Sequence, residues 1–232
     1  MSQVSDQDHK IECFKAYDIR GKVPSQLNEV IAFRIGIAIA KYLNASAVVV
    51  GYDIRPTSPQ LVEALSRGIA HQGAEVIDIG FCGTEEIYFA TNDLHTDGGI
   101  MVTASHNPSD YNGMKIVGRE AKPISMDSGL AEIKDLAENL TEKPSEGELI
   151  TTKKNIRKNY LNKVLSFVDT TELEPLKILV NAGNGCAGPV IDAMEDLLPF
   201  EFHKINHPPD GSFPNGIPNP LLPENRSVTA KA

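Results

Sequence analysis

Apolar residues between positions 25 and 43 recur at spacings of three and four, which is the period of an α-helix with one buried face. The residues that carry this pattern are Leu27, Val30, Ile31, Ile35, Ala38, Ile39 and Tyr42. Ser25 follows Pro24 and is a good N-cap, so we predict that the helix begins there. The next segment, residues 46–53, is a continuous apolar run rich in valine, which is typical of a strand covered on both faces.

The alternation of helix and strand continues along the chain. Ser58 and Pro59 predict the start of a second helix, Gly73 predicts its end, and residues 74–80 predict another strand. A buried strand is then expected just before Ser105. It is followed by a short strand over residues 113–118 and by a helix that carries Leu130, Ile133 and Leu136. Strand, helix and strand in this order predict an α/β fold with a parallel sheet.

A second α/β unit is predicted after a linker near residue 150. Residues 141–154 contain few apolar side chains and mix proline, glycine and charge. The expected elements beyond it are a helix over 155–168, a strand over 176–183, a helix that opens on Pro189, and the first turn of a further helix at the end of a tail rich in Pro, Gly and Asn. We therefore divide the chain into a first domain, 1–150, and an incomplete second domain, 151–232. Apolar surface left exposed on an incomplete domain predicts self-association.

Composition narrows the class of protein. With 41% hydrophobic residues the chain can bury a core, and a net charge of -9 argues against nucleic acid or an anionic membrane as a partner. The three cysteines are far apart and form no C-x-x-C pair, which favours a reducing compartment. The first residues are too polar for a signal peptide, and the most apolar segment is too short to span a bilayer. We expect a soluble, cytoplasmic protein.

The stretch TASHNP, residues 103–108, concentrates polar groups at the predicted end of a strand. Ser105 stands between Thr103 and His106, and Asn107 precedes a proline. The open edge at the carboxyl ends of parallel strands is where α/β proteins bind ligands, so Ser105 is a candidate nucleophile. No G-x-S-x-G pattern surrounds it, and Ser, Asn and Pro also favour plain turns. Both interpretations remain open on these residues alone.

Two further segments carry candidate chemistry. Residues 14–22 place Tyr17, Asp18, Arg20 and Lys22 ahead of the first helix, and the planar fork of arginine suits phosphate oxygens. A solvated, charged loop is an equally good interpretation of that segment. Lys115 follows Ser105 by ten residues and is either a functional group or an ordinary exposed strand residue.

Together these motifs closely resemble the α-D-phosphohexomutase family. The likeness rests on YDIRG, TASHNP and YNGMKIV in this order, and on PDGSFPNGIPNPLLPEN at residues 209–225, which is similar to the family's segment just before its metal-binding loop. It extends from about Phe14 to the last residue and is strongest with bacterial phosphomannomutases of the type that feeds GDP-mannose synthesis. The resemblance implies a three-layer first domain around a mixed, largely parallel sheet, followed by a second domain of similar type.

Carried over position by position, the resemblance implies that Ser105 is a phosphoserine that donates and later retakes a phosphoryl group. Its phosphate is then one ligand of a Mg²⁺ ion. His106 and Asn107 correspond to residues that contact the substrate, and Tyr17 to one that positions it. Arg20 and Lys115 correspond to residues that stabilise charge and transfer protons. The implied reaction interconverts mannose 1-phosphate and mannose 6-phosphate through a bisphosphorylated hexose, which also acts as activator. Hexose phosphate is thus the expected partner.

One family feature is missing from the sequence. The acidic D-G-D-x-D-R loop, which supplies three aspartates to the metal, does not occur in the 232 residues. We therefore expect the first domain and part of the second of a four-domain enzyme, with weak Mg²⁺ binding and no full turnover by this chain alone. The turn NAGNGCAGP lacks the spacing of standard phosphate loops, so a plain strand-to-helix turn is expected there.

Two alternatives stay open at this point. A phosphoglucomutase or phosphoglucosamine mutase keeps the family and changes the sugar, since the sugar-recognition domain lies outside the sequence. A non-catalytic sugar-phosphate-binding module keeps the fold and lacks the chemistry, and it predicts no phosphate on Ser105.

Overall fold

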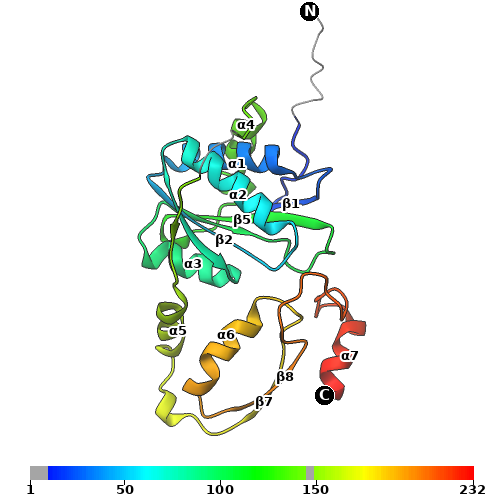
Figure 1. The fold of residues 1–232 in the computed structure, drawn as a ribbon. Coiled ribbons are helices and arrows are strands. Elements are labelled where there is room, and N and C mark those ends of the chain that lie inside the picture. Colours follow the sequence, from blue (N-terminus) through cyan, green and yellow to red (C-terminus); the bar gives the residue numbers. More distant parts are fainter. Residues whose placement is uncertain (1–9, 145–148) are drawn as a thin grey trace, which may run out of the picture.

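The computed structural model describes residues 10–144 and 149–232. Figure 1 shows two units along the chain, a larger one built on a six-stranded sheet and a smaller one built on a two-stranded sheet. The polar start of the chain, which the sequence analysis judged too polar for a signal peptide, falls for the most part outside the described residues. Part of the predicted linker, residues 145–148, also lies outside them.

The large sheet has the strand order β1-β5-β4-β2-β3-β6. Its strands are β1 (Ile19–Lys22), β2 (Ala47–Tyr52), β3 (Glu75–Phe81), β4 (Gly98–Val102), β5 (Tyr111–Gly118) and β6 (Thr152–Lys153). The pairs β2–β3, β2–β4 and β3–β6 are parallel, while β5 runs antiparallel to both of its neighbours. The sheet is therefore mixed and largely parallel, as predicted.

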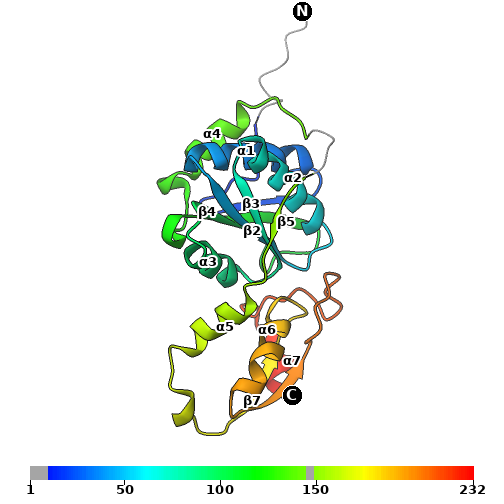
Figure 2. The same cartoon turned by 60° about the vertical axis from the view of Figure 1, so that its left-hand side comes forward.

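Helices cover both faces of this sheet and make the first unit a three-layer structure (Figures 1 and 2). The helices are α1 (Glu29–Leu43), α2 (Ser58–His71), α3 (Thr84–Asp93) and α4 (Leu130–Glu138). Buried residues of α1, α2 and α4 form one core with one face of the sheet, and α3 forms a second core with the other face. The buried valine run of β2 contributes to both cores, which explains its continuous apolar sequence.

The first helix starts later than its sequence suggested. Asn28, and not Ser25, is the N-cap of α1, and its side chain accepts a hydrogen bond from the N–H of Ile31. An asparagine oxygen satisfies a free N–H of the first turn as well as serine does, so the apolar period alone could not choose between them. The second helix begins at Ser58 with Pro59 in its first turn, as predicted.

The second unit contains α5 (Arg157–Leu165), β7 (Lys177–Asn181), α6 (Ala187–Met194), β8 (Glu201–Ile205) and α7 (Pro223–Lys231). Strands β7 and β8 are parallel. The helix predicted to open on Pro189 begins two residues earlier. Short 3₁₀ turns complete the two units at Arg119–Ala121, Met126–Ser128, Thr170–Glu172 and Glu195–Leu197. Sequence analysis missed β1, α3, β6 and β8.

The predicted linker is partly ordered structure. Thr152 and Lys153 form β6, which pairs with Ile77 and Asp78 of β3 and extends the large sheet. Ile156 follows and is buried in the core on the α3 side. The chain thus remains attached to the first unit until α5 begins, and the domain boundary near residue 150 stays a prediction.

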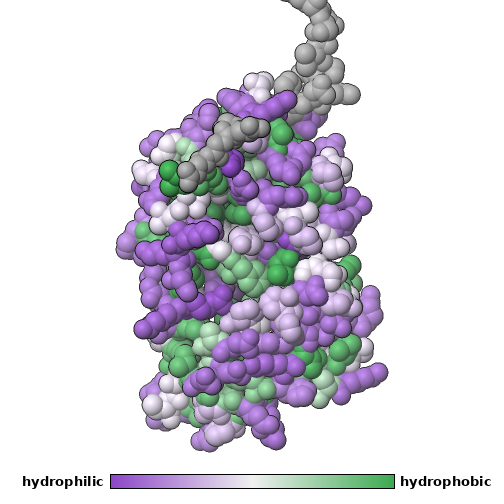
Figure 3. Space-filling view, in the orientation of Figure 1, coloured by the Kyte–Doolittle hydropathy of each residue, from purple (hydrophilic) through white to green (hydrophobic). Residues whose placement is uncertain are grey.

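Apolar side chains remain exposed on the second unit (Figure 3). They include Phe167, Val168, Leu176, Leu197, Leu221 and Val228. Helices of the described ranges are all too short or too polar to cross a membrane.

Candidate active site

The TASHNP loop follows directly on β4, whose five residues are all buried. The N–H of Thr103 donates to the carbonyl of Gly113 and continues the pairing with β5 for one more residue. The chain then turns outward at Ser105, which is exposed and has a φ of 54°. A non-glycine residue in this left-handed region costs about 1–3 kcal/mol, and such residues cluster at functional sites. The turn presents the Ser105 hydroxyl to solvent at the carboxyl end of a central parallel strand.

A buried network of hydrogen bonds centred on Asp53 fixes the start of the loop. The hydroxyl of Thr103 donates to Asp53 Oδ2 at 2.6 Å and accepts a hydrogen bond from the N–H of Ser105 at 2.9 Å. The other carboxylate oxygen of Asp53 accepts from the Ser58 hydroxyl at 2.7 Å and from the N–H of Arg55 at 3.1 Å. Asp53 is 8% exposed, and these contacts satisfy its buried charge.

The Arg55 side chain holds the remainder of the loop through the backbone carbonyls of that loop. Its guanidinium donates to four carbonyl oxygens, those of Ser105 (2.8 Å), Asn107 (2.7 Å), Pro108 (2.6 Å) and Tyr111 (3.0 Å). Its Nε lies 3.2 Å from Asp53 Oδ2, and its side chain has no exposed surface. Burial lowers the pKa of this guanidinium, and Asp53 opposes that effect. Four of the five donors in this rigid fork are thus directed at the loop, and the fifth is directed at Asp53.

Arg20 and Lys115 lie beside the loop on one face of the sheet. Arg20 Nη1 donates to the carbonyl of Thr103, and its Nη2 lies 3.0 Å from Asp18 Oδ2. Lys115 Nζ lies 3.3 Å from the same carboxylate oxygen. Burial lowers the pKa of Arg20, and the charge of Asp18 opposes that effect. A single carboxylate therefore holds the two cations together. Neither Arg20 nor Lys115 is a freely solvated charge, which was the alternative that the sequence left open.

Gly113 allows this approach of β1 to β5. Arg20 is its register partner, and a Cβ at position 113 would collide with the carbonyl oxygen of Ile19 and crowd the Arg20 guanidinium. Residues 113 and 115 point to the same side of β5 because side chains alternate along a strand. The YNGMK segment therefore contributes Lys115 to this face of the sheet and, at Gly113, leaves room there for the Arg20 guanidinium.

The three remaining predicted site residues differ in their exposure and in their contacts with the loop. His106 is exposed next to Ser105, with its Nδ1 3.4 Å from the Ser105 hydroxyl. Asn107 is half-buried, and its backbone is held by Arg55. Tyr17 is 79% exposed on the turn before β1, and the contacts described here do not join it to Ser105. The fold thus brings Ser105, His106, Arg20 and Lys115 into one region and leaves Tyr17 at its margin.

Sequence analysis missed Asp53 and Arg55. Both follow the buried run of β2, and β2 lies next to β4 in the sheet. Charged residues directly after a buried parallel strand lie at the edge where ligands bind, and this was the available signal. Asp18 was noted only as part of a charged segment, and its role as the shared partner of two cations was not predicted.

The described residues do not form a magnesium site on their own. In residues 10–144 and 149–232 no group of three or more His, Cys, Asp or Glu side chains is placed to hold a metal ion. A phosphate on Ser105 would supply oxygen ligands, but Mg²⁺ requires near-octahedral coordination that one phosphate does not complete.

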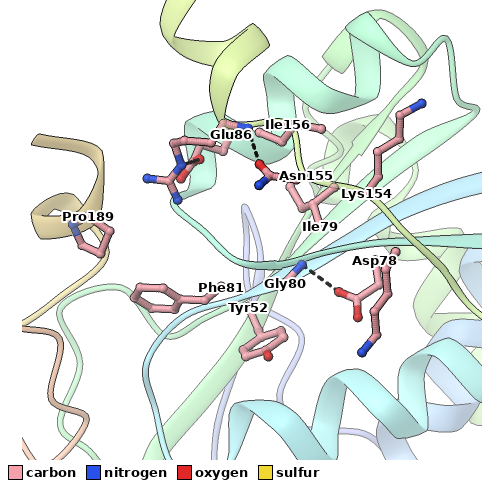
Figure 4. A pocket seen from close by; sticks show the side chains of 12 residues that line it. Tyr52, Asp78, Ile79, Gly80, Phe81, Glu86, Lys154, Asn155, Ile156 and Pro189 are labelled. Carbon is pink, nitrogen blue, oxygen red and sulfur yellow. Dashed lines mark hydrogen bonds and ion pairs between the residues drawn. The ribbon is translucent and has the colours of Figure 1, made fainter. Parts of the chain in front are cut away.

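A separate hollow of about 710 Å³ lies between the first unit and α6 (Figure 4). Its wall includes Asp78, which accepts a hydrogen bond from the N–H of Gly80 at 2.8 Å, and the Glu86–Arg157 ion pair at 3.0 Å. Burial raises the pKa of Glu86, although the N–H of Gly83 and the charge of Arg157 oppose it. Ser105 does not line this hollow, so the candidate chemistry belongs to the open loop and not to this hollow.

Comparisons with known proteins agree on one family. The sequence family described as phosphoglucomutase/phosphomannomutase, alpha/beta/alpha domain I, matches residues 12–144, and its domain II counterpart matches residues 158–232. Relatives include a protein named phosphohexose mutases from Xanthomonas campestris pv. campestris, 55% identical over 96% of this chain, and phosphomannomutases from Salmonella typhimurium (53%) and Escherichia coli K12 (50%), each likewise over 96% of this chain.

A solved structure of similar shape is the phosphoglucomutase/phosphomannomutase family protein of Burkholderia thailandensis. It matches with a TM-score of 0.83 and 33% identity over 94% of this chain and 49% of that protein. The chain spans about half the length of the curated relatives it matches, 50% in each of the three just named.

Proposed function

Because this chain belongs to the phosphoglucomutase/phosphomannomutase family, we propose that it is part of a phosphohexomutase in which Ser105 carries the exchanged phosphoryl group. One observation carries the proposal. The Ser105 hydroxyl is exposed at the carboxyl end of β4, on a left-handed turn held by Arg55. Arg20, which shares Asp18 with Lys115, donates to the carbonyl of Thr103, two residues before Ser105. A plain turn requires neither the backbone strain nor the buried arginine.

The proposed reaction consists of two phosphoryl transfers. In the first, the bond between Ser105 Oγ and phosphorus breaks while a free hydroxyl of a hexose phosphate forms a new O–P bond and gives up its proton. The product is a hexose bisphosphate. In the second, the other phosphate of this intermediate returns to Ser105, whose hydroxyl loses its proton. The net result moves phosphate between positions 1 and 6 of the sugar.

The neighbouring side chains have roles that follow from charge and position. Phosphoryl transfer passes through a loose transition state, so catalysis consists mainly of positioning and of neutralising oxygen charge. Arg20 and Lys115 supply two positive charges beside the loop, and Lys115 also serves proton transfer. His106 and Asn107 contact the substrate, and Tyr17 positions it. A Mg²⁺ ion would be held by the Ser105 phosphate only together with carboxylates that the described residues do not supply, and it would neutralise oxygen charge on the transferred group.

Mannose phosphate is the substrate that we propose. The support is that relatives at 53% and 50% identity are named phosphomannomutases, while a relative at 55% carries the broader name phosphohexose mutases. Glucose and glucosamine phosphates remain the alternatives within the family. Supply of GDP-mannose for surface polysaccharide, in the cytoplasm, is the corresponding biological role. Rates with the three hexose 1-phosphates, compared in the protein of the complete reading frame, decide among the sugars.

The decisive experiment locates the phosphate. Protein isolated from its native cells is digested with trypsin, and the peptide of residues 68–115 is examined by mass spectrometry. We expect phosphate on Ser105 and loss of mutase activity of at least about a thousand-fold in Ser105→Ala. Ser109→Ala, which removes an exposed hydroxyl of the same loop, is the matched control and keeps its activity. An unmodified Ser105 would instead support the non-catalytic binding module.

A further inference from the structure

The turn Asp53–Pro56, which holds the Ser105 loop, is contacted by the second unit. Three residues of that unit meet it, namely Cys186, Gly211 and Phe213. The Cys186 thiol is hydrogen-bonded to the backbone of Ile54, and burial raises its pKa to about 12. A turn that binds one loop on one side and a second unit on the other is in a position to couple the two.

Phe213 makes the contact nearest to the loop. Its ring centroid lies 5.4 Å from the guanidinium carbon of Arg55, a cation–π distance. The side chain is 8% exposed, one of few large apolar side chains in the second unit to be buried. Because Arg55 has no exposed surface, the stacking takes place without competing water, where cation–π contacts are strongest. Arg55 therefore has the loop carbonyls on its edge and an aromatic ring on its face.

The backbone around Phe213 is shaped for this contact. Phe213 has a φ of 50°, a left-handed conformation that a bulky side chain rarely adopts. A Cβ at Gly211 would collide with the carbonyl oxygen of Ile54, so only glycine allows the segment this close to the turn. The N–H of Asp210 donates to the carbonyl of Asn184 at 2.9 Å, which anchors the segment to the second unit.

We propose that Phe213 is a positioning residue for Ser105, acting through Arg55, so that docking of the second unit sets the geometry of the phosphoryl-carrying loop. The catalytic meaning of this coupling rests on the proposed function, but the coupling itself does not. Phe213 limits the movement of the Arg55 guanidinium, and Arg55 fixes the four carbonyls that define the loop. The loop is then ordered fully only when both units are in contact.

Amide hydrogen exchange of the intact chain tests the coupling directly. We expect Phe213→Leu to speed exchange of the amides in residues 103–111 about thirty-fold, the equivalent of one lost desolvated cation–π contact. Phe213→Tyr keeps a ring over Arg55 and restores slow exchange. Phe167→Leu is the matched control, because Phe167 also stacks on a lysine in the second unit but is exposed. We expect no change in the loop from that control.

A second variant guards against general unfolding. Gly211→Ala keeps the Phe213 and Arg55 side chains unmutated, but its Cβ forces the segment that carries Phe213 away from Ile54. This variant is therefore expected to speed exchange in the same loop. Gly118→Ala, where the new Cβ meets ordinary contacts at 3.7 Å and beyond, is the control. Faster exchange confined to 103–111 supports the proposal. Unchanged loop exchange, or an equal increase over β2 and β3, overturns it.

The catalytic consequence has its own measurement. In the protein of the complete reading frame, Phe213→Leu is expected to lower kcat about ten-fold and to leave KM within about two-fold, because the phosphoryl donor is misplaced while the substrate contacts remain. A change in KM alone would contradict a positioning role. If the wild type carries no phosphate on Ser105 the proposed function fails, whereas the exchange experiment still decides whether Phe213 orders the loop.

Discussion

Replacement of Arg55 by methionine tests the physical basis of the site most sharply. Methionine fills a similar volume with apolar atoms and removes all donors at once. The change leaves the carbonyl oxygens of Ser105, Asn107, Pro108 and Tyr111 without their partner, and it leaves the carboxylate of Asp53 buried without its counter-charge.

The expected loss can be worked out from these contacts. A buried acceptor left unsatisfied costs about 1–3 kcal/mol, and removing one partner of a buried ion pair costs about 3–5 kcal/mol. The loop carbonyls lie near the surface and regain water, so the ion-pair value is the better guide. We expect Arg55→Met to lower the free energy of unfolding by about 3–5 kcal/mol, a large part of the 5–15 kcal/mol typical of a domain.

Arg55→Lys gives an intermediate loss, since it keeps the charge facing Asp53 but lacks the planar fork that reaches several carbonyls. Asp53→Asn combined with Arg55→Met is expected to cost less than the sum of the single changes. The two side chains form one network, and coupling of at least about 1 kcal/mol follows.

Urea unfolding followed by far-UV circular dichroism measures these values, because the chain contains no tryptophan to serve as a fluorescent probe. Arg67→Met, which breaks a surface ion pair with Glu63, is the matched control and is expected to change stability by no more than about 1 kcal/mol. A loss below about 1 kcal/mol in Arg55→Met, or strict additivity with Asp53→Asn, would refute the view that this pair holds the loop.

Three further outcomes are expected. Lys115→Met lowers kcat of the complete protein by about 10²–10⁴-fold with little change in stability, while Lys122→Met, an exposed control, does not; equal rates in both would remove Lys115 from the chemistry. Burial raises the pKa of the Asp97 carboxyl, but two backbone N–H groups and Arg119 donate to it and hold its net pKa below 3.8. The stabilising effect of the Asp97 carboxylate is therefore present above pH 3.8 and is lost as pH falls through the lowered pKa. The difference in stability between wild type and Asp97→Asn is expected to shrink on acidification below pH 3.8. A difference that stays constant would contradict this. The exposed apolar side chains of the second unit predict association of this chain, and light scattering that shows only monomers at high concentration would count against it.

Sequence patterns predicted the elements in which buried apolar residues recur at a regular spacing. The helices α1 and α2 and the strands β2, β3 and β4 each carry enough apolar residues for their period to be visible. Strand β1 was missed because its residues, IRGK, become a strand only by pairing with β5. Helix α3 contains several polar and acidic residues, and only a few of its side chains reach the core.

The site residues also divide into a group that the sequence could predict and a group that it could not. Ser105, His106 and Asn107 are neighbours in sequence, so their grouping could be predicted. The Arg55–Asp53 network joins residues that are about 50 positions apart, and it depends on β2 and β4 lying side by side. The shared contact of Arg20 and Lys115 with Asp18 depends likewise on β1 pairing with β5. Local patterns contain no information on which strands become neighbours.

The most direct test of the central claim follows the phosphate on Ser105 through one transfer. Protein of the complete reading frame, purified from its native cells, is mixed with mannose 1-phosphate, and the peptide of residues 68–115 is examined by mass spectrometry before and after mixing. The phosphate of the added mannose 1-phosphate carries a heavy oxygen isotope. The account predicts that the unlabelled phosphate of Ser105 passes to the sugar and that the labelled phosphate then takes its place on Ser105. A Ser105 that never carries phosphate, or that keeps its unlabelled phosphate while the sugar turns over, would contradict the account.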